Sequence, residues 1–401
     1  MMPALEGFSI VTGLLLGSAV LLCLPLFSEL LQVLSSLGRR MPANSGEGLY
    51  FGPRLLFLIP AHDEELLIRS CVESVLALDY PTDRFDIHVI ADNCRDRTAD
   101  IARACGAQVL ERHEPQNPGK PSALAWALQR LDVSSYDGVV VLDADSVVDP
   151  GFALALLDSG PLRYKAVQTY FGLRNEWDTW LTRLAGLLSR LRYEVTYPRK
   201  YRAGINCPLT GNGMVLGTEL LAKGWRAFSL TENWELYAMF TAEGTSIHLN
   251  KSARLFSEEA ATTDQGQTQR KRWMSGRWSV FRDYWRQILL SREIGLHQKL
   301  DALTELGRPS PILHLGLVIG ICGLAVATQD PPGSWIVSAI ALLSLTPEIT
   351  GLISVLSSHP KRTKVILDSL HIPRYLVWRV TITLATLLGS GPKSWKRTDR
   401  L

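Results

Sequence analysis

The sequence has almost no net charge and few cysteines, and both shortages exclude classes of protein. Its 42 Lys and Arg nearly balance 39 Asp and Glu, so the formal net charge is only +3. That is too small for a protein that binds nucleic acid through its phosphates. The six cysteines are scattered without a C-x-x-C pair, which argues against a secreted, disulfide-stabilised domain and favours a reducing compartment. We therefore expect no nucleic acid among its partners.

Long apolar runs, by contrast, are present. The run 7–37 contains one charged residue, Glu29, and the runs 311–328 and 335–358 are also long enough to span a bilayer. A shorter run, 375–388, contains an arginine and is compatible with an interfacial helix, a re-entrant helix or a poor span. No Lys or Arg precedes the first run, so an uncleaved anchor is favoured over a signal peptide.

Basic residues flank these runs unevenly and predict the orientation of the chain. They follow the first run, precede the second and follow the third, whereas the loop 329–334 has none. The residues concerned are Arg39, Arg40, Arg308, Lys361, Arg362 and Lys364. By the positive-inside rule, the region between residues 40 and 308 faces the cytosol. We expect an integral membrane protein, in the plasma membrane of a bacterium.

From residue 54 onwards, strand and helix patterns alternate. Strands are predicted over 55–60, 85–91, 107–110 and 138–142, and helices over 64–76, 98–105 and 122–131. This alternation is typical of an α/β fold with a mostly parallel sheet. Ligands bind beyond the carboxyl ends of such strands. Polar clusters stand at these ends, over 61–65, 92–96 and 143–145.

Two of these clusters contain acidic residues with alternative interpretations. Asp143 and Asp145 follow four apolar residues, and two carboxylates at a strand end can hold one Mg²⁺ or Mn²⁺. An exposed acidic loop is the alternative. Asp92 and Asn93 could bind a nucleobase or ribose, or form an Asx turn or a helix cap.

Two basic segments follow further along the chain. The turn 117–120 places Lys120 before a helix, where it could meet a phosphate or belong to a plain surface turn. From Gln269, aromatic residues recur at spacings of three to five among Arg and Lys. That pattern predicts an amphipathic helix in the lipid headgroup layer.

Taken in order, the segments resemble the motifs of the inverting family-two glycosyltransferases. The motifs, within residues 54–280, are IPAHDEE, ADNCRDRTADIA, NPGKPSALAWAL, VLDADSVVDPGF, LTGNGMVLG, LTENWEL and QRKRW. The tail 395–400 is also similar to the C-terminal signature of that family. Membrane-integrated relatives include cellulose, chitin and poly-N-acetylglucosamine synthases and ceramide glucosyltransferase. The resemblance implies a GT-A fold and a metal-dependent, inverting hexosyltransferase that uses a UDP-sugar and Mg²⁺ or Mn²⁺.

The resemblance also implies roles for individual residues. The donor-binding residues would be Ala61, Glu64, Asp92, Lys120 and Asp143. Asp145, together with Asp143, would hold the metal. The acceptor side would be lined by Gly211, Asn212, Gly213 and Met214. Gln269, Arg272 and Trp273, of the Q-x-x-R-W motif, would lie at the diphosphate and the acceptor entrance, where a guanidinium and a metal stabilise the leaving group.

One position departs from the pattern of the family. The family usually has Thr-Glu-Asp, in which the Asp is the general base, but this chain has Thr231, Glu232 and Asn233. A neutral carboxamide cannot accept the proton of the acceptor. Glu232 is the first candidate for the base and Glu235 the second. The third interpretation is a catalytically inactive chain.

The expected organisation is an anchor over 1–40, a GT-A domain over 41–265, amphipathic helices over 266–308, and membrane and interfacial helices over 309–401. The expected function is sugar transfer to a membrane-associated glycolipid or polysaccharide. Three spans favour a glycolipid, because a polysaccharide channel would require a homo-oligomer or a synthase partner. The alternative, motivated by Asn233, is a non-catalytic nucleotide-sugar-binding partner of a synthase complex.

Overall fold

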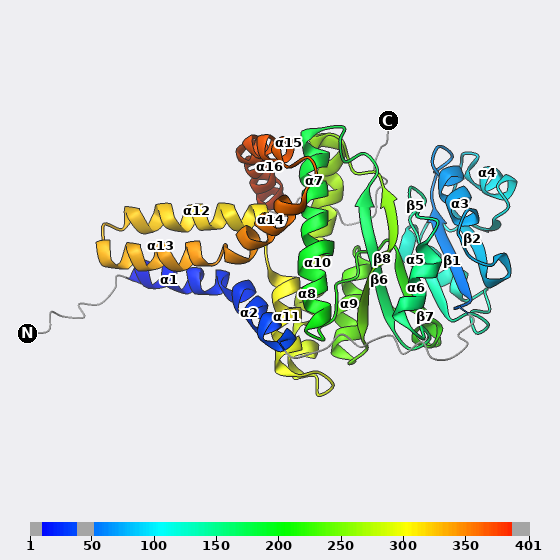
Figure 1. Cartoon of the computed structure of the whole chain (residues 1–401), viewed down its shortest axis with the longest axis horizontal. Helices are drawn as coiled ribbons and strands as arrows, with labels where there is room; N and C mark the ends of the chain where they lie inside the picture. The colour runs from blue at the N-terminus through cyan, green and yellow to red at the C-terminus, as the bar shows by residue number, and fades with distance from the viewer. Residues whose placement is uncertain (1–9, 38–51, 387–401) are drawn as a thin grey trace, which may run out of the picture.

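A mixed, eight-stranded sheet forms the centre of the larger part of the molecule (Figure 1). The computed structural model describes residues 10–37 and 52–386. The strand order is β3-β2-β1-β4-β7-β6-β8-β5. The strands are β1 (Leu55–Ala61), β2 (Phe85–Asp92), β3 (Gln108–Arg112), β4 (Gly138–Val141), β5 (Val147–Val148), β6 (Ala166–Leu173), β7 (Met214–Gly217) and β8 (Ile247–Ser257).

The half of the sheet that precedes residue 142 is parallel, as the sequence predicts. β1 pairs in parallel with β2 and with β4, and β2 pairs in parallel with β3. The later strands make the sheet mixed, because β7 runs antiparallel to β4 and β6, and β5 antiparallel to β8. β6 and β8 are again parallel. The predicted α/β fold is confirmed.

Alternation along β1 explains why its sequence is a continuous apolar run. Leu55, Phe57 and Ile59 belong to the core on one face of the sheet, and Leu56 and Leu58 to the core on the other. Successive strand residues point to opposite faces, so helices on both faces require apolar residues at every position. The helices of this domain are α3 (Ile68–Leu76), α4 (Thr98–Ala104), α5 (Lys120–Leu128), α6 (Phe152–Leu156), α7 (Trp180–Arg190), α8 (Tyr197–Arg202) and α9 (Glu232–Ala242).

Apolar helices project from one end of this domain (Figure 1). They are α1 (Ile10–Leu22), α12 (Pro311–Ala327) and α13 (Pro331–Leu343). Two helical stretches, Ile10–Ser36 and Pro331–Ser358, are long and apolar enough to cross a membrane. A third is counted if α11 (Leu296–Gly307) and α12, which meet at a bend of 83°, form one broken span.

Two further helices, α2 (Leu24–Ser36) and α14 (Thr346–Ser358), form the second halves of these two stretches. The remaining helices are α10 (Thr263–Leu290), α15 (Arg362–Asp368) and α16 (Ile372–Ala385). The amphipathic helix predicted from Gln269 corresponds to α10, and α16 covers the shorter apolar run. Arg39, Arg40 and the segment 395–400, which entered the predictions, lie outside the described residues.

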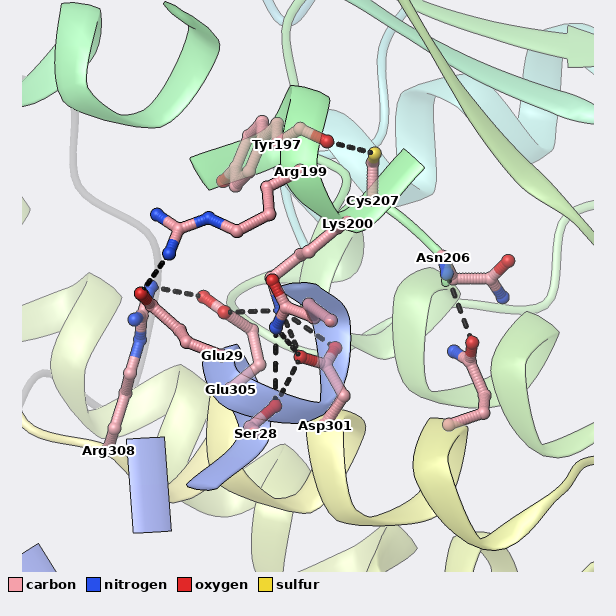
Figure 2. Close-up of polar contacts among 12 residues, drawn as sticks. Ser28, Glu29, Tyr197, Arg199, Lys200, Asn206, Cys207, Asp301, Glu305 and Arg308 are labelled. Atoms are coloured by element: carbon pink, nitrogen blue, oxygen red, sulfur yellow. Dashed lines mark hydrogen bonds and ion pairs between the residues drawn. The ribbon is translucent and has the colours of Figure 1, made fainter. Parts of the chain in front are cut away.

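A buried network of ion pairs joins α2 to α8 and α11 (Figure 2). Lys200 of α8 lies 2.7 Å from both carboxylate oxygens of Asp301 and 3.0 Å from Glu305 Oε2. Ser28 and Gln32 of α2 donate hydrogen bonds of 2.9 Å to Asp301. Burial alone would lower the pKa of Lys200, but the two carboxylates outweigh burial and raise it. The lysine therefore stays charged and holds three helices together.

Replacing Lys200 with Met should destabilise the protein strongly. The substitution leaves Asp301 and Glu305 buried without their shared cation, which costs roughly 3–5 kcal/mol. The thermal unfolding midpoint in detergent should fall accordingly. Lys223→Met, which removes an exposed lysine, is the control, and equal midpoints for the two variants would contradict the role of the network.

Candidate active site

Four segments of the chain meet around one lysine at the carboxyl end of the parallel strands. Lys120 is the first residue of α5 and follows Gly119, whose φ of 110° suits only glycine. The ammonium of Lys120 lies 2.6 Å from Asp143 Oδ1 and 3.7 Å from Glu232 Oε1. It also donates a hydrogen bond to the carbonyl of Gly211. The turn after β4, the loop before β7 and the start of α9 are thereby brought together.

Arg272 of α10 interacts electrostatically with the same carboxylates. Burial lowers the pKa of Arg272, and Glu232 and Asp143 oppose that change. Burial raises the pKa of Glu232, which Lys120 opposes and Asp143 reinforces. Lys120 itself keeps a raised pKa despite its burial, because Asp143 and Glu232 face it. Two cations and two carboxylates therefore share one partly buried site.

The Q-x-x-R-W motif lies on α10, where two of its polar side-chain atoms are buried. Gln269 Oε1 and Arg272 Nε are buried, and neither has a hydrogen-bond partner within the described part of the chain. Leaving such atoms unpaired costs about 1–3 kcal/mol each, so they favour a ligand that would supply partners. Trp273 is 43% exposed on the same helix.

The acidic turn after β4 is held in shape by Asn212. The Asn212 carboxamide accepts a hydrogen bond of 3.1 Å from the Asp143 backbone and donates one of 2.8 Å to Ser146 Oγ. Asp145 is only 7% exposed. The carboxylates at 143 and 145 supply the oxygen ligands that Mg²⁺ and Mn²⁺ prefer, with water and phosphate completing the shell. The donor set fits such a cation.

Two other residues of the predicted acceptor side, Gly213 and Met214, lie where the chain enters β7. Gly213 has a φ of 66°, and a Cβ there would lie 2.1 Å from Leu255 and 2.3 Å from Thr169. Met214 is fully buried in the core. Only glycine fits at 213, and the side chain of Met214, the first residue of β7, packs in the core on one face of the sheet. Their role toward an acceptor stays a prediction.

The structure separates the three residues considered at the Thr-Glu-Asn motif. The Asn233 carboxamide donates a hydrogen bond of 2.8 Å to the carbonyl of Leu209. The Glu235 carboxylate accepts hydrogen bonds from the Ser229 backbone at 2.7 Å and the Tyr284 hydroxyl at 3.2 Å. Of the two glutamates, the one that faces Lys120 is Glu232.

Three of the predicted donor-binding residues, which the family resemblance assigns to uridine, lie at or just after the ends of β1 and β2. Ala61 ends β1, and the backbone of Glu64 donates a hydrogen bond of 2.7 Å to Thr98. The Asp92 carboxylate is buried and accepts hydrogen bonds from Arg112 at 2.5 Å and from the Gly119 backbone at 3.1 Å. Asp92 therefore ties β2, β3 and the start of α5 together. Nothing in these contacts tests binding to uridine, which stays a prediction.

Arg112 is the residue at this edge that sequence reasoning missed. It is 1% exposed and pairs with both Asp92 and Glu114. Its signal in the sequence, a cation two residues after the predicted strand 107–110, does not differ from the polar residues that follow many strands. Its partner lies 20 residues earlier in the chain, so only the parallel pairing of β2 and β3 reveals it.

The sequence profile described as "Glycosyltransferase like family 2" matches residues 53–276. The chain belongs to this family. Among its relatives is the beta-monoglucosyldiacylglycerol synthase of Synechocystis sp., 27% identical over 263 residues that make up 63% of this chain and 54% of that protein. The cellulose synthase 1 catalytic subunit [UDP-forming] of Komagataeibacter xylinus is 31% identical over 132 residues, 32% of this chain and 16% of that one.

A solved structure shares the fold of this family-2 glycosyltransferase. The mannosyltransferase PcManGT from Pyrobaculum calidifontis, in complex with GDP-Man and Mn²⁺, superposes with a TM-score of 0.57 at 18% identity. The match covers 93% of this chain and 99% of that one, and it shows a GT-A fold. The chain spans about half the length of the glycolipid-synthase relative named above.

Proposed function

We propose that this glycosyltransferase transfers a sugar from a UDP-sugar, with inversion, to a lipid acceptor at the cytosolic face of a membrane. The observation that carries the proposal is the contact of 3.7 Å between Glu232 and Lys120, whose ammonium lies 2.6 Å from Asp143. A candidate base and the groups that face the donor thereby share one site.

The proposed reaction begins with the acceptor hydroxyl beside Glu232. This carboxylate accepts the proton while the acceptor oxygen attacks the anomeric carbon from the face opposite the diphosphate. The raised pKa of Glu232, caused by burial, makes it a stronger base than an ordinary carboxylate. Asn233 takes no part in proton transfer, because its carboxamide cannot accept the proton.

The cations of the site stabilise the departing UDP. Lys120 and Arg272 face the negative charge that grows on the diphosphate as the glycosidic bond breaks. Asp143 and Asp145 would hold Mg²⁺ or Mn²⁺, which would supply a Lewis acid to the same oxygens. The unpaired nitrogen of Arg272 would gain a partner there.

The names of the relatives and the candidate membrane spans support the proposed acceptor and donor. One relative is named as a beta-monoglucosyldiacylglycerol synthase, which supports a lipid acceptor, and another is named as UDP-forming, which supports a UDP-sugar. Two or three candidate spans are enough for an entrance from the bilayer. The distribution of Lys and Arg supports a cytosolic site.

Donor hydrolysis tests the proposal directly. Purified protein in detergent with Mn²⁺ should slowly release UDP from one of a panel of radiolabelled UDP-sugars, with water as the acceptor. Mass spectrometry of lipid extracts from cells with and without the gene should then show a new glycolipid. If no donor is hydrolysed and Asn233→Asp gains nothing, the binding-protein alternative motivated by Asn233 holds instead.

A further inference from the structure

Arginines from separate elements converge where α11 turns into α12. Arg277 of α10 donates a hydrogen bond to the backbone carbonyl of Arg308. Arg379 of α16 donates one of 3.3 Å to Ser310 Oγ, two residues further along the same connection. Arg192 comes from the π-helix η3 (Leu191–Thr196), whose last residue lines one small cavity together with Arg308, and its side chain is exposed. We call Arg192, Arg277 and Arg379 the arginine cluster.

The charges of Arg192 and Arg379 act on Arg277. Burial, together with repulsion from Arg308, Arg192 and Arg379, lowers the pKa of Arg277 to about 10, although Glu305 opposes this. Burial likewise lowers the pKa of Arg379, Arg270 and Arg192 add to the effect, and Tyr375 opposes it. Such repulsion is relieved by an anion.

The carboxylates near the cluster are already paired with other cations. Glu305 lies 3.0 Å from both Lys200 and Arg308, and Glu29 pairs with Arg199 (Figure 2). Glu348 of α14 lies 2.9 Å from His314. Within residues 10–37 and 52–386, none of the ion pairs involves a member of the arginine cluster.

The place of the cluster indicates which anion it meets. The connection at 308–310 is where the polar helix α11 bends by 83° into the apolar helix α12. If α12 enters the bilayer, this bend lies at the headgroup layer. Phosphate is the anion of that layer, and the planar guanidinium matches phosphate with paired hydrogen bonds.

The arginine cluster is also close to the proposed base. Arg277 lies five residues after Arg272 on α10, a rise of about 7.5 Å. Its neighbour Gly276 packs so tightly on Thr231 that a Cβ would lie 2.4 Å from Thr231 Cγ2. Thr231 directly precedes Glu232. A small headgroup held at the cluster could thus present a hydroxyl to Glu232.

We propose that the arginine cluster binds the phosphate of an anionic phospholipid whose headgroup carries a hydroxyl, and that this lipid is the acceptor. The inference rests on the proposed function. The headgroup O–H gives its proton to Glu232, its oxygen forms the new bond to the anomeric carbon, and the bond from that carbon to UDP breaks. UDP leaves with the bonding pair.

Phosphatidylglycerol and diacylglycerol, each presented in nanodiscs of otherwise uncharged lipid, test this assignment. With the identified UDP-sugar and Mn²⁺, the full-length protein should glycosylate phosphatidylglycerol in preference to diacylglycerol. Arg192→Gln, which changes an exposed side chain, should raise the KM for the lipid roughly tenfold by removing one charged hydrogen bond. Arg379→Gln should act in the same direction.

The controls separate the cluster from general membrane attraction and from the chemistry. Arg286→Gln removes a positive charge from an exposed position of α10 and should leave the KM unchanged. UDP release with water as acceptor should be unchanged in all three variants. Inorganic phosphate alone should inhibit only far above the lipid concentration that saturates the site.

Several outcomes would overturn the inference. Equal use of diacylglycerol, or an unchanged KM in both cluster variants, would show that the arginines bind no lipid phosphate. Inhibition by inorganic phosphate at the same concentration as the lipid would indicate a site for free phosphate. Failure of the proposed function looks different, because wild-type protein would then release no UDP from any donor.

Discussion

Replacing Glu232 with Gln is expected to reduce sugar transfer by roughly a hundred- to ten-thousand-fold, the range that a general base contributes. Gln has the shape of Glu but cannot accept the proton of the acceptor. Affinity for UDP in the presence of Mn²⁺ should change much less, because Asp143, Asp145 and Arg272 remain. The measurement is the rate of product formation at saturating donor and acceptor, alongside UDP binding by calorimetry.

The pH dependence of wild-type transfer gives a second readout of the same residue. Burial raises the pKa of Glu232 above that of an ordinary glutamate, while Lys120 lowers it and Asp143 raises it. The rate should fall as pH drops through this raised pKa, because a protonated Glu232 cannot act as a base. The acidic limb of kcat should therefore lie at a higher pH than an ordinary glutamate would give, and it should disappear in Glu232→Gln.

Asn233 supplies the matched control for this prediction. Asn233→Asp places a carboxylate at the position where the family usually has its base, next to Glu232 on α9. In the Glu232→Gln background, this change should restore part of the lost activity. A Glu232→Gln variant with the full wild-type rate would show that the base lies elsewhere, with Glu235 as the next residue to replace.

The sequence predicts one half of the sheet well because the signal there is local. β1 to β4 are short apolar runs that end in polar residues, and each is followed by a helix or a turn. β6, β7 and β8 have no such independent signal. Their places depend on pairing between distant segments, such as Ala166 with Ile247 and Val141 with Met214. Such pairings are set by tertiary packing.

At the site, the sequence identifies the candidate catalytic residues but does not decide which of the two glutamates acts as the base. Glu232 and Glu235 are three residues apart, so they lie on neighbouring parts of the surface of α9. Only contacts from elsewhere distinguish them, since Lys120 faces Glu232 and Tyr284 binds Glu235. The arginine cluster was equally hidden, because its members are up to 187 positions apart, from 192 to 379.

Replacing Asp145 with Ala is expected to weaken Mn²⁺-dependent UDP binding by at least roughly a hundredfold, judged against the 10- to 100-fold effect of residues that only support metal ligands. The diphosphate and the cation share ligands, so the loss of one carboxylate weakens both. Adding a chelator to the wild-type protein should reduce UDP affinity to the level of the variant. Membrane insertion should be unaffected.

Because Asp145 is only 7% exposed, a folding defect has to be separated from a metal defect. Asp145→Asn keeps the volume of the side chain and removes the charge, so it should retain the wild-type unfolding midpoint yet lose most of the response to Mn²⁺. Asp100→Ala, at an exposed position of α4, should change neither property. If Asp145→Ala binds UDP as tightly as wild type with Mn²⁺ present, the cation is not held at this turn. Catalysis would then depend on Lys120 and Arg272 alone to stabilise the leaving diphosphate.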